Sequence, residues 1–250
     1  QGWFYAIRGT SYNFYFMIIL GLLLTESKKH LQVFIYTWLA ISLLAVLWGF
    51  KQRLLGPDAA EQAWLNAGNA STHVLRGKLR IFSFYSDAGQ FGVAMAHTAL
   101  VFFALALGRG INLSRRALFV MAGLLFFYSM AISGTRGALF VLAAGAPVYL
   151  AANRDFKLLV VGLLVLGSGY GMLRYTYIGQ SNYEIQRLRS ALNPEDASLN
   201  VRKKNQQILA RYLADKPLGG GIGTSGYFGL RFSPNTLLAQ TPTDSWYVRI

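Results

Sequence analysis

The segment LQVFIYTWLAISLLAVLWGF, residues 31–50, runs for twenty residues without a charged side chain. A helix of about 20 apolar residues crosses the roughly 30 Å hydrocarbon core of a bilayer, because backbone amides in lipid must be satisfied within their own segment. Four more uncharged stretches, of 16 to 21 residues each, follow before Arg174, at residues 88–108, 117–135, 137–153 and 158–173. The sequence therefore predicts a multi-span membrane protein, whose function is exerted at or across a membrane.

The predicted fold class is an all-α, polytopic transmembrane helical bundle. A weaker apolar stretch at residues 9–25, which opens with polar residues, brings the predicted spans in residues 1–173 to six. Strands of a membrane β-barrel are disfavoured, because they need segments of about 10 residues with alternating polarity. Residues 118–130, in contrast, are apolar on every side.

A second predicted domain, residues 174–245, has a mixed polar sequence. This segment is too long for a simple connector, and we expect a folded extracytoplasmic loop domain that contains helices. Residues 246–250 resemble the start of a further span, and the chain opens at Gln1 without an initiator methionine. We therefore expect further helices beyond both ends.

The charged residues are few and strongly biased towards Lys and Arg. Only 14% of the residues are charged and 54% are hydrophobic, yet the net charge is +14. Cationic loops beside membrane spans explain part of this excess, and the rest favours anionic partners such as lipid headgroups or phosphate-bearing substrates. Nucleic acid is an improbable partner, because no recognition fold interrupts the spans. The absence of cysteine excludes disulfides and thiolate metal sites.

The basic residues also predict an orientation. Alternate short loops carry seven of them, and the positive-inside rule places these loops in the cytoplasm: Lys28, Lys29, Arg109, Arg115, Arg116, Arg154 and Lys157. The opposite, outer face then carries residues 51–81, the turn at residues 134–136 and everything after Leu173. Five basic residues in the first outer loop argue against this orientation: Lys51, Arg53, Arg76, Lys78 and Arg80.

One helix is predicted within the loop domain, from a possible N-cap at Ser198 to about Asp215. Pro217 and the glycines at residues 219–223 then end it. One face of this helix carries three basic side chains, Arg202, Lys203 and Arg211. These form either a binding surface or simply the solvated side of the helix.

Two further elements of the outer face can carry chemistry. Arg136, in the sequence SGTRG at residues 133–137, stands between two apolar helices, where an arginine is costly unless it snorkels or binds an anion. Asp244 lies in TPTDSWY at residues 241–247, where the chain returns to the membrane. Its carboxylate could cap the incoming helix, or it could accept a proton from a sugar hydroxyl as a general base.

Four motifs in order resemble those of the O-antigen ligase and polymerase superfamily, and they extend over about two thirds of the chain. They are RIFSFYSD at residues 80–87, SGTRG at residues 133–137, Arg202 followed by PLGGGIG at residues 217–223, and DSWY at residues 244–247. None of these motifs is specific alone. Their order, with a long outer loop between the last two, carries the resemblance.

This resemblance implies a glycosyltransferase of the bacterial cytoplasmic membrane whose active site faces the periplasm. Such an enzyme moves a glycan from an undecaprenyl diphosphate carrier to an acceptor hydroxyl on a lipid or glycan. By position, Arg136 and Arg202 are the residues that grip the diphosphate, and Arg80 and Tyr247 are further candidates for substrate binding. The family needs no metal, nucleotide or other cofactor. Asp87 and Gln90, at the outer end of one span, are candidates to line the lipid or acceptor groove.

The chain departs from the family pattern at the base. Ligases of this family commonly have a histidine where Asp244 stands, and no histidine occurs here after His97. Either Asp244 serves as the base, or the chain performs a related transfer with different acid–base details. Ligase and polymerase both stay open.

A transporter or flippase of anionic lipid-linked sugars is the alternative from another class, because it also needs several helices, boundary arginines and an outer gate. Transporters tend to show internal repeats and paired interrupted helices, and no convincing repeat is visible here. A purely structural scaffold gives no reason for Arg136, Arg202 and Asp244 to share one face.

Overall fold

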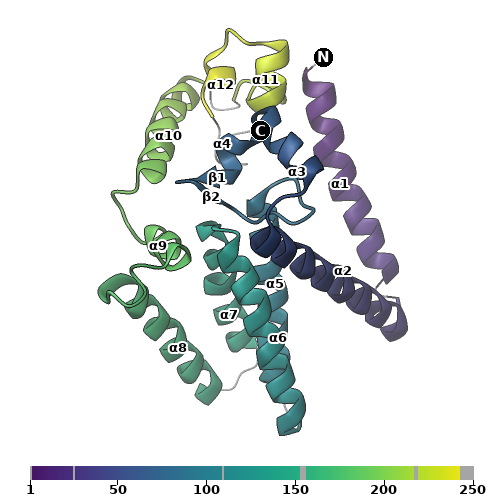
Figure 1. Ribbon diagram of the computed structural model, residues 1–250. Coiled ribbons are helices and arrows are strands. Elements are labelled where there is room, and N and C mark those ends of the chain that lie inside the picture. The colour runs from purple at the N-terminus through teal and green to yellow at the C-terminus, as the bar shows by residue number, and fades with distance from the viewer. Residues whose placement is uncertain (1, 25, 109, 153–155, 217–218, 243–250) are drawn as a thin grey trace. The chain divides into compact units, whose positions relative to one another are not determined.

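The computed structural model describes residues 2–24, 26–108, 110–152, 156–216 and 219–242 (Figure 1). These residues are mostly helical, and the strands among them are the two-residue pair β1 (Val74–Leu75) and β2 (Lys78–Leu79), which form a small antiparallel hairpin. The prediction of an all-α fold is confirmed.

Four helices in the described part of the chain are long and apolar enough to cross a membrane: α1 (Gly2–Leu24), α2 (Lys28–Leu55), α5 (Ala88–Ala106) and α6 (Leu113–Ile132). This agrees with the prediction of a membrane protein. The last two predicted spans also coincide with helices. These are α7 (Leu139–Ala152), which follows the 3-10 turn η2 (Arg136–Ala138), and α8 (Phe156–Tyr175).

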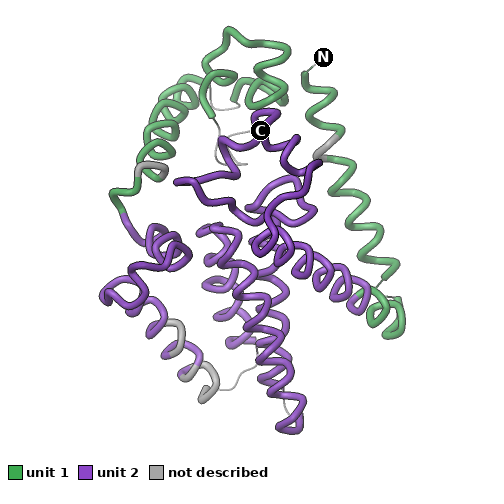
Figure 2. Tube along the Cα trace, viewed as in Figure 1, with its two compact units in different colours: residues 1–34, 194–250 green, residues 35–193 purple. Residues whose placement is uncertain are grey.

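The chain divides into two compact units, which are described separately here (Figure 2). Unit 1 comprises residues Gln1–Phe34 and Pro194–Ile250, and unit 2 comprises residues Ile35–Asn193. The predicted loop domain at residues 174–245 is thus shared between the units: α9 (Tyr183–Ser190) lies in unit 2, and unit 1 holds α10 (Ala197–Asp215), α11 (Gly226–Phe232) and α12 (Leu237–Gln240).

The helix predicted inside the loop domain is present as α10, and its end at Asp215 is confirmed. Its predicted N-cap at Ser198 is wrong. The cap is Asp196, whose side chain accepts a hydrogen bond of 3.1 Å from the backbone N–H of Leu199, so the helix begins at Ala197. A carboxylate is as good an N-cap as a hydroxyl and is also favoured by the helix dipole. Within unit 1, the ring of Tyr5 in α1 stacks on Phe232 of α11.

The core of unit 2 lies between α5 and α6, which run side by side (Figure 1). Phe91 and Met95 of α5 and Met130 of α6 are fully buried in it. Gly92 lets the end of α6 approach, because a Cβ at this position would overlap the side chains of Ser133 and Thr135. The hydroxyl of Thr135 then donates to the Ala88 carbonyl over 2.9 Å, so the end of α6 is fastened to the start of α5.

Between α2 and α5 the chain folds through α3 (Ala59–Trp64), the π-helical turn η1 (Leu65–Asn69), α4 (Ala70–His73) and the hairpin. Gln52 of α2, buried to 2% exposure, holds this segment. Its amide donates to the Ser83 carbonyl (2.9 Å) and to Glu61 Oε1 (2.7 Å), while its Oε1 accepts from the Ser83 N–H at 2.8 Å. The residues that follow the hairpin are therefore fixed against the helices.

A carboxylate pair reinforces the start of α3. Asp58 and Glu61 form a capping box, and both accept from the Lys51 ammonium. The backbone N–H of Glu61 and the Lys51 ammonium hold the pKa of the Asp58 carboxyl below its ordinary value. This ion cluster is linked through Glu61 to Gln52 and belongs to the scaffold that carries residues 80–87.

Candidate functional site

The structure brings together two of the five predicted site residues. Arg80 and Arg136 both lie in unit 2, beside one turn. Arg202 lies on α10 of unit 1 with an exposed side chain, so its convergence with Arg136 stays a prediction. Asp244 and Tyr247 lie outside the described residues.

The turn is formed by residues 133–135, between α6 and η2. Ser133 is the C-cap of α6, and its hydroxyl donates to the Met130 carbonyl at 2.6 Å. Gly134 has a φ of +61°, which a residue with a side chain rarely adopts. A Cβ here would lie 3.6 Å from Arg80 Cγ and 4.0 Å from Arg187 Nε. Glycine therefore permits both the backbone conformation and the approach of two arginines.

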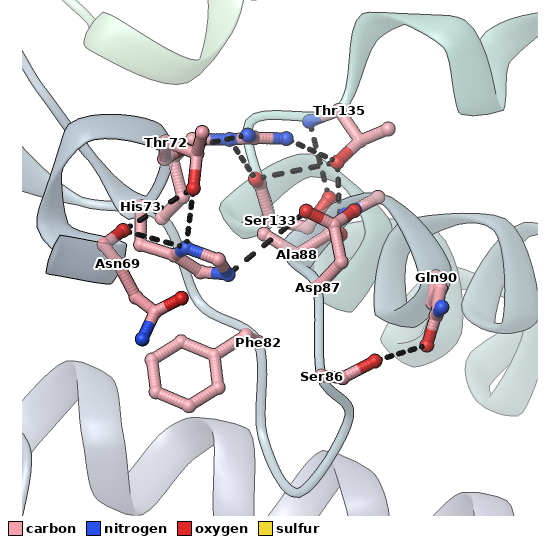
Figure 3. Close-up of polar contacts among 12 residues, drawn as sticks. Asn69, Thr72, His73, Phe82, Ser86, Asp87, Ala88, Gln90, Ser133 and Thr135 are labelled. Atoms are coloured by element: carbon pink, nitrogen blue, oxygen red, sulfur yellow. Dashed lines mark hydrogen bonds and ion pairs between the residues drawn. The ribbon is translucent and has the colours of Figure 1, made fainter. Parts of the chain in front are cut away.

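Arg80 follows β2 and ties three segments together. Its Nε donates to the Ser133 carbonyl (3.2 Å), its Nη2 to the Thr135 hydroxyl (3.0 Å) and its Nη1 to the Thr72 carbonyl (3.0 Å). All three acceptors are uncharged, and Figure 3 shows Thr72, Ser133 and Thr135 around this position. Burial lowers the pKa of the Arg80 guanidinium, the negative charge of Asp87 opposes that shift, and the positive charge of Arg187 adds to it. The group still stays protonated at any physiological pH.

Two more arginines join the turn to α9, Arg136 from η2 and Arg187 from α9 itself. Arg136 Nη1 donates to the carbonyl and the hydroxyl of Ser190, each at 3.2 Å. In the opposite direction, Arg187 Nη2 of α9 donates to the Gly134 carbonyl of the turn over 3.4 Å. The Nε of Arg187 is buried and has no hydrogen-bond partner. Helix α9 is thus fixed to the turn in both directions, and it places a third guanidinium there.

The cluster formed by Arg80, Arg136 and Arg187, named the arginine cluster below, is rich in positive charge. The described residues include ion pairs of Lys51 with Asp58 and with Glu61 and of Arg53 with Glu184, and a contact of His73 with Asp87. None of them includes Arg80 or Arg187. Partly buried like charges repel, and a bound anion relieves this repulsion. Guanidinium groups bind phosphate oxygens in pairs, so the cluster is suited to a phosphate-bearing ligand.

The arginine cluster lies beside the ends of two candidate membrane spans, α5 and α6. Helix α5 begins at Ala88 and α6 ends at Ile132, and both of these ends meet the turn. The cluster therefore lies at one end of two helices that are long enough to cross a bilayer.

A titratable pair lies next to the arginine cluster. Nε2 of His73, at the end of α4, is 3.9 Å from Oδ2 of Asp87 (Figure 3). His73 is 3% exposed, whereas the Asp87 side chain is 46% exposed. Asp87 is also the N-cap of α5, because its Oδ1 accepts from the Gly89 N–H at 2.6 Å.

The sequence reading missed Arg187 and His73. For Arg187 a signal was available, since the sequence YEIQRLRS at residues 183–190 is an amphipathic helix with two arginines in its last turn. His73 has no such signal, because only the folded hairpin brings it to Asp87. Among the described residues, no group of three or more His, Asp or Glu side chains could hold a metal ion.

No family model matches this chain, and neither a curated protein nor a solved structure does. The resemblance to O-antigen ligases and polymerases thus rests on the four motifs alone.

Proposed function

We propose that this chain is a membrane glycosyltransferase. It moves a glycan from an undecaprenyl diphosphate carrier to a hydroxyl of a lipid or glycan acceptor, as O-antigen ligases and polymerases do. The observation that supports this most is the arginine cluster, which gathers three guanidinium groups at one end of α5 and α6.

The chemistry of such a transfer explains the need for the arginine cluster. When the bond between the sugar and the diphosphate breaks, negative charge builds on the departing phosphates. Fixed guanidinium groups stabilise that charge and stay protonated throughout. Removal of one such donor raises the barrier by about 3 to 4 kcal/mol, judged from oxyanion-binding donors in other enzymes.

The place of the arginine cluster fits a lipid-linked donor. A polyprenyl chain stays in the hydrocarbon region while its diphosphate lies at the membrane surface. Cations at the end of two candidate spans meet that diphosphate without leaving the boundary. By the positive-inside rule this end faces away from the cytoplasm, which in a bacterial cytoplasmic membrane is the periplasmic side.

Arg202 and Tyr247 complete the proposed binding residues, with Arg202 as a second grip on the diphosphate. A base must also take the proton of the acceptor hydroxyl as the new bond forms. Asp244 is the candidate that the sequence offers for this role.

The test is a transfer assay with the full-length protein in lipid vesicles. It is given an undecaprenyl diphosphate oligosaccharide and either the same oligosaccharide or a lipid as acceptor, and released undecaprenyl diphosphate is measured. Release with chain growth supports a polymerase, and release with transfer to the lipid supports a ligase. Movement of the glycan across the bilayer without release overturns the proposal in favour of a transporter. Absence of both release and movement overturns it as well.

A further inference from the structure

His73 and Asp87 lie close together, but no hydrogen bond joins them. The imidazole packs edge-on against Trp64 and Phe82, with ring centroids 4.9 Å and 5.2 Å away. It is buried at 3% exposure, yet its Nε2 has no hydrogen-bond partner. The nearest acidic group to that nitrogen is Oδ2 of Asp87, at 3.9 Å (Figure 3).

The other ring nitrogen decides which tautomer the neutral ring adopts. Nδ1 lies 3.0 Å from the carbonyl oxygen of Asn69, which can only accept, so Nδ1 carries a hydrogen. The Thr72 hydroxyl, 2.9 Å from Nδ1, donates to the same carbonyl. In the neutral ring Nε2 therefore holds a lone pair that faces the Asp87 carboxylate. Nε2 and Oδ2 are 3.9 Å apart, which is longer than a hydrogen bond, so the two side chains have to approach each other before a proton passes between them.

Asp87 is accessible to a substrate on its other side. One carboxylate oxygen caps α5, while Oδ2 faces His73, and the side chain is 46% exposed. The charge of Asp87 acts on Arg80, which in turn bonds to the turn that Arg136 follows. A half-exposed carboxylate with a proton acceptor behind it thus lies beside the arginine cluster, within unit 2.

From this geometry we infer that Asp87 takes the proton of the acceptor hydroxyl, and that His73 is a positioning residue that receives the proton from it. The inference rests on the proposed function and names the base of that reaction. The sequence left open whether Asp244 replaces the usual histidine or the acid–base arrangement differs. The pair of His73 and Asp87 is such a different arrangement.

The O–H bond of the acceptor breaks as its oxygen bonds to the anomeric carbon of the donor sugar. The electron pair of the sugar–phosphate bond leaves with the diphosphate, next to the arginine cluster. The hydroxyl proton passes to Oδ2 of Asp87 and then to Nε2 of His73, and it returns to water when the products leave.

The experiment compares Asp87→Asn with Asp58→Asn in the full-length protein. Both changes replace a capping carboxylate with an amide, which still caps a helix, so folding is preserved in each. We expect Asp87→Asn to transfer glycan about 100-fold more slowly or worse, because general-base catalysis contributes at least that factor. Its affinity for undecaprenyl diphosphate stays within about twofold of wild type, on the premise that the base does not hold the donor. Asp58→Asn transfers at the wild-type rate.

A second variant tests the role of His73. In His73→Asn the amide keeps a donor towards Asn69 and lacks the nitrogen at Nε2. We expect the profile of transfer rate against pH to change shape, because the group that receives the proton from Asp87 is lost. The charged and titratable groups near Asp87 are His73 of α4 and Arg80 after β2, and Arg187 and Tyr183 of α9 act on Arg80. A purely structural role lowers the rate by one factor at every pH.

The outcomes separate the two proposals. If Asp87→Asn transfers glycan at the wild-type rate, the assignment of the base is overturned and the proposed function stands. A wild-type protein that releases no carrier diphosphate overturns the proposed function, and the assignment of the base falls with it.

Discussion

Arg80 donates from Nε to the carbonyl of Ser133, 3.2 Å away and 53 residues later in the chain. This bond joins the segment after the hairpin to the end of α6. Because neighbouring bonds bring Arg136 and Arg187 to the same turn, the contact defines where three positive charges meet.

Replacement of Arg187 tests the part of the arginine cluster that the sequence did not reveal. In Arg187→Ala we expect glycan transfer to fall by about 100- to 1,000-fold, because one donor to the departing diphosphate is lost. The matched control is Arg189→Ala on the same helix, whose guanidinium donates instead to the Ile178 carbonyl at 2.7 Å. The measurement is the initial rate of carrier release. Equal rates in both variants would remove Arg187 from the site.

Arg202 tests the contribution of unit 1. The side chain is exposed on α10, so Arg202→Ala leaves folding and membrane insertion intact. We expect transfer to be abolished, as for Arg136→Ala, while Lys203→Ala on the same helix retains activity. Transfer assays on membranes with matched protein amounts check this. Normal activity in Arg202→Ala limits the diphosphate site to unit 2.

Gln52 tests the scaffold that holds residues 80–87. Gln52→Ala leaves the Ser83 N–H and carbonyl buried without partners, and we expect a loss of about 2 to 3 kcal/mol in the free energy of unfolding. Gln62→Ala, on the exposed side of α3, is the control, since its side-chain amide donates to the exposed Asn66. Denaturant unfolding in detergent measures both. A similar small effect in the two variants contradicts the role given to Gln52.

The ion pair between Arg53 and Glu184, with 2.7 Å between Nη1 and Oε1, predicts a pH-dependent stability. Burial raises the pKa of the Glu184 carboxyl, but the backbone N–H of Glu184 and the Arg53 guanidinium outweigh it, so the pKa lies below its ordinary value. A depressed pKa stabilises the fold above the unfolded value of about 4.3, and this contribution disappears as the pH falls through the folded value.

Arg53→Ala is therefore expected to cost about 0.5 to 1 kcal/mol at pH near 7 and close to nothing at strongly acidic pH. Thermal unfolding at several pH values, in wild type and variant, measures the difference. A difference that stays constant down to acidic pH shows that the ion pair does not contribute.

The helices could be predicted from the sequence, but only some of their ends: the end of α10 at Asp215 was predicted correctly, whereas its N-cap was not. Uncharged runs of this length are helical because lipid leaves the backbone no other partner. The ends depend on caps that charge patterns do not reveal. Helix α6 begins at Leu113, four residues before the predicted span, because the Asn112 side chain accepts from the Arg115 N–H at 2.9 Å.

Single residues of the candidate site could be predicted from the sequence, but their arrangement around one turn could not. Arg136 stands out in the sequence, since an arginine between two apolar helices is costly without a partner, whereas Arg80 was singled out only by the family resemblance. Their meeting at one turn depends on the φ of Gly134 and on the fit of α9, which are tertiary features. Arg187 and His73 escaped notice for the same reason, because each gains its neighbours only in the fold.

The most direct test of the account is the affinity of the full-length protein for undecaprenyl diphosphate in lipid nanodiscs, measured for wild type, Arg136→Ala and Arg116→Ala. Both variants lose one positive charge, but Arg116 lies in the first turn of α6, at the end of the helix away from the arginine cluster. We expect saturable binding to wild type and Arg116→Ala, and binding at least about tenfold weaker in Arg136→Ala, because that variant loses a charge-assisted phosphate contact. Equal affinity in all three proteins, or no saturable binding to wild type, would contradict this expectation.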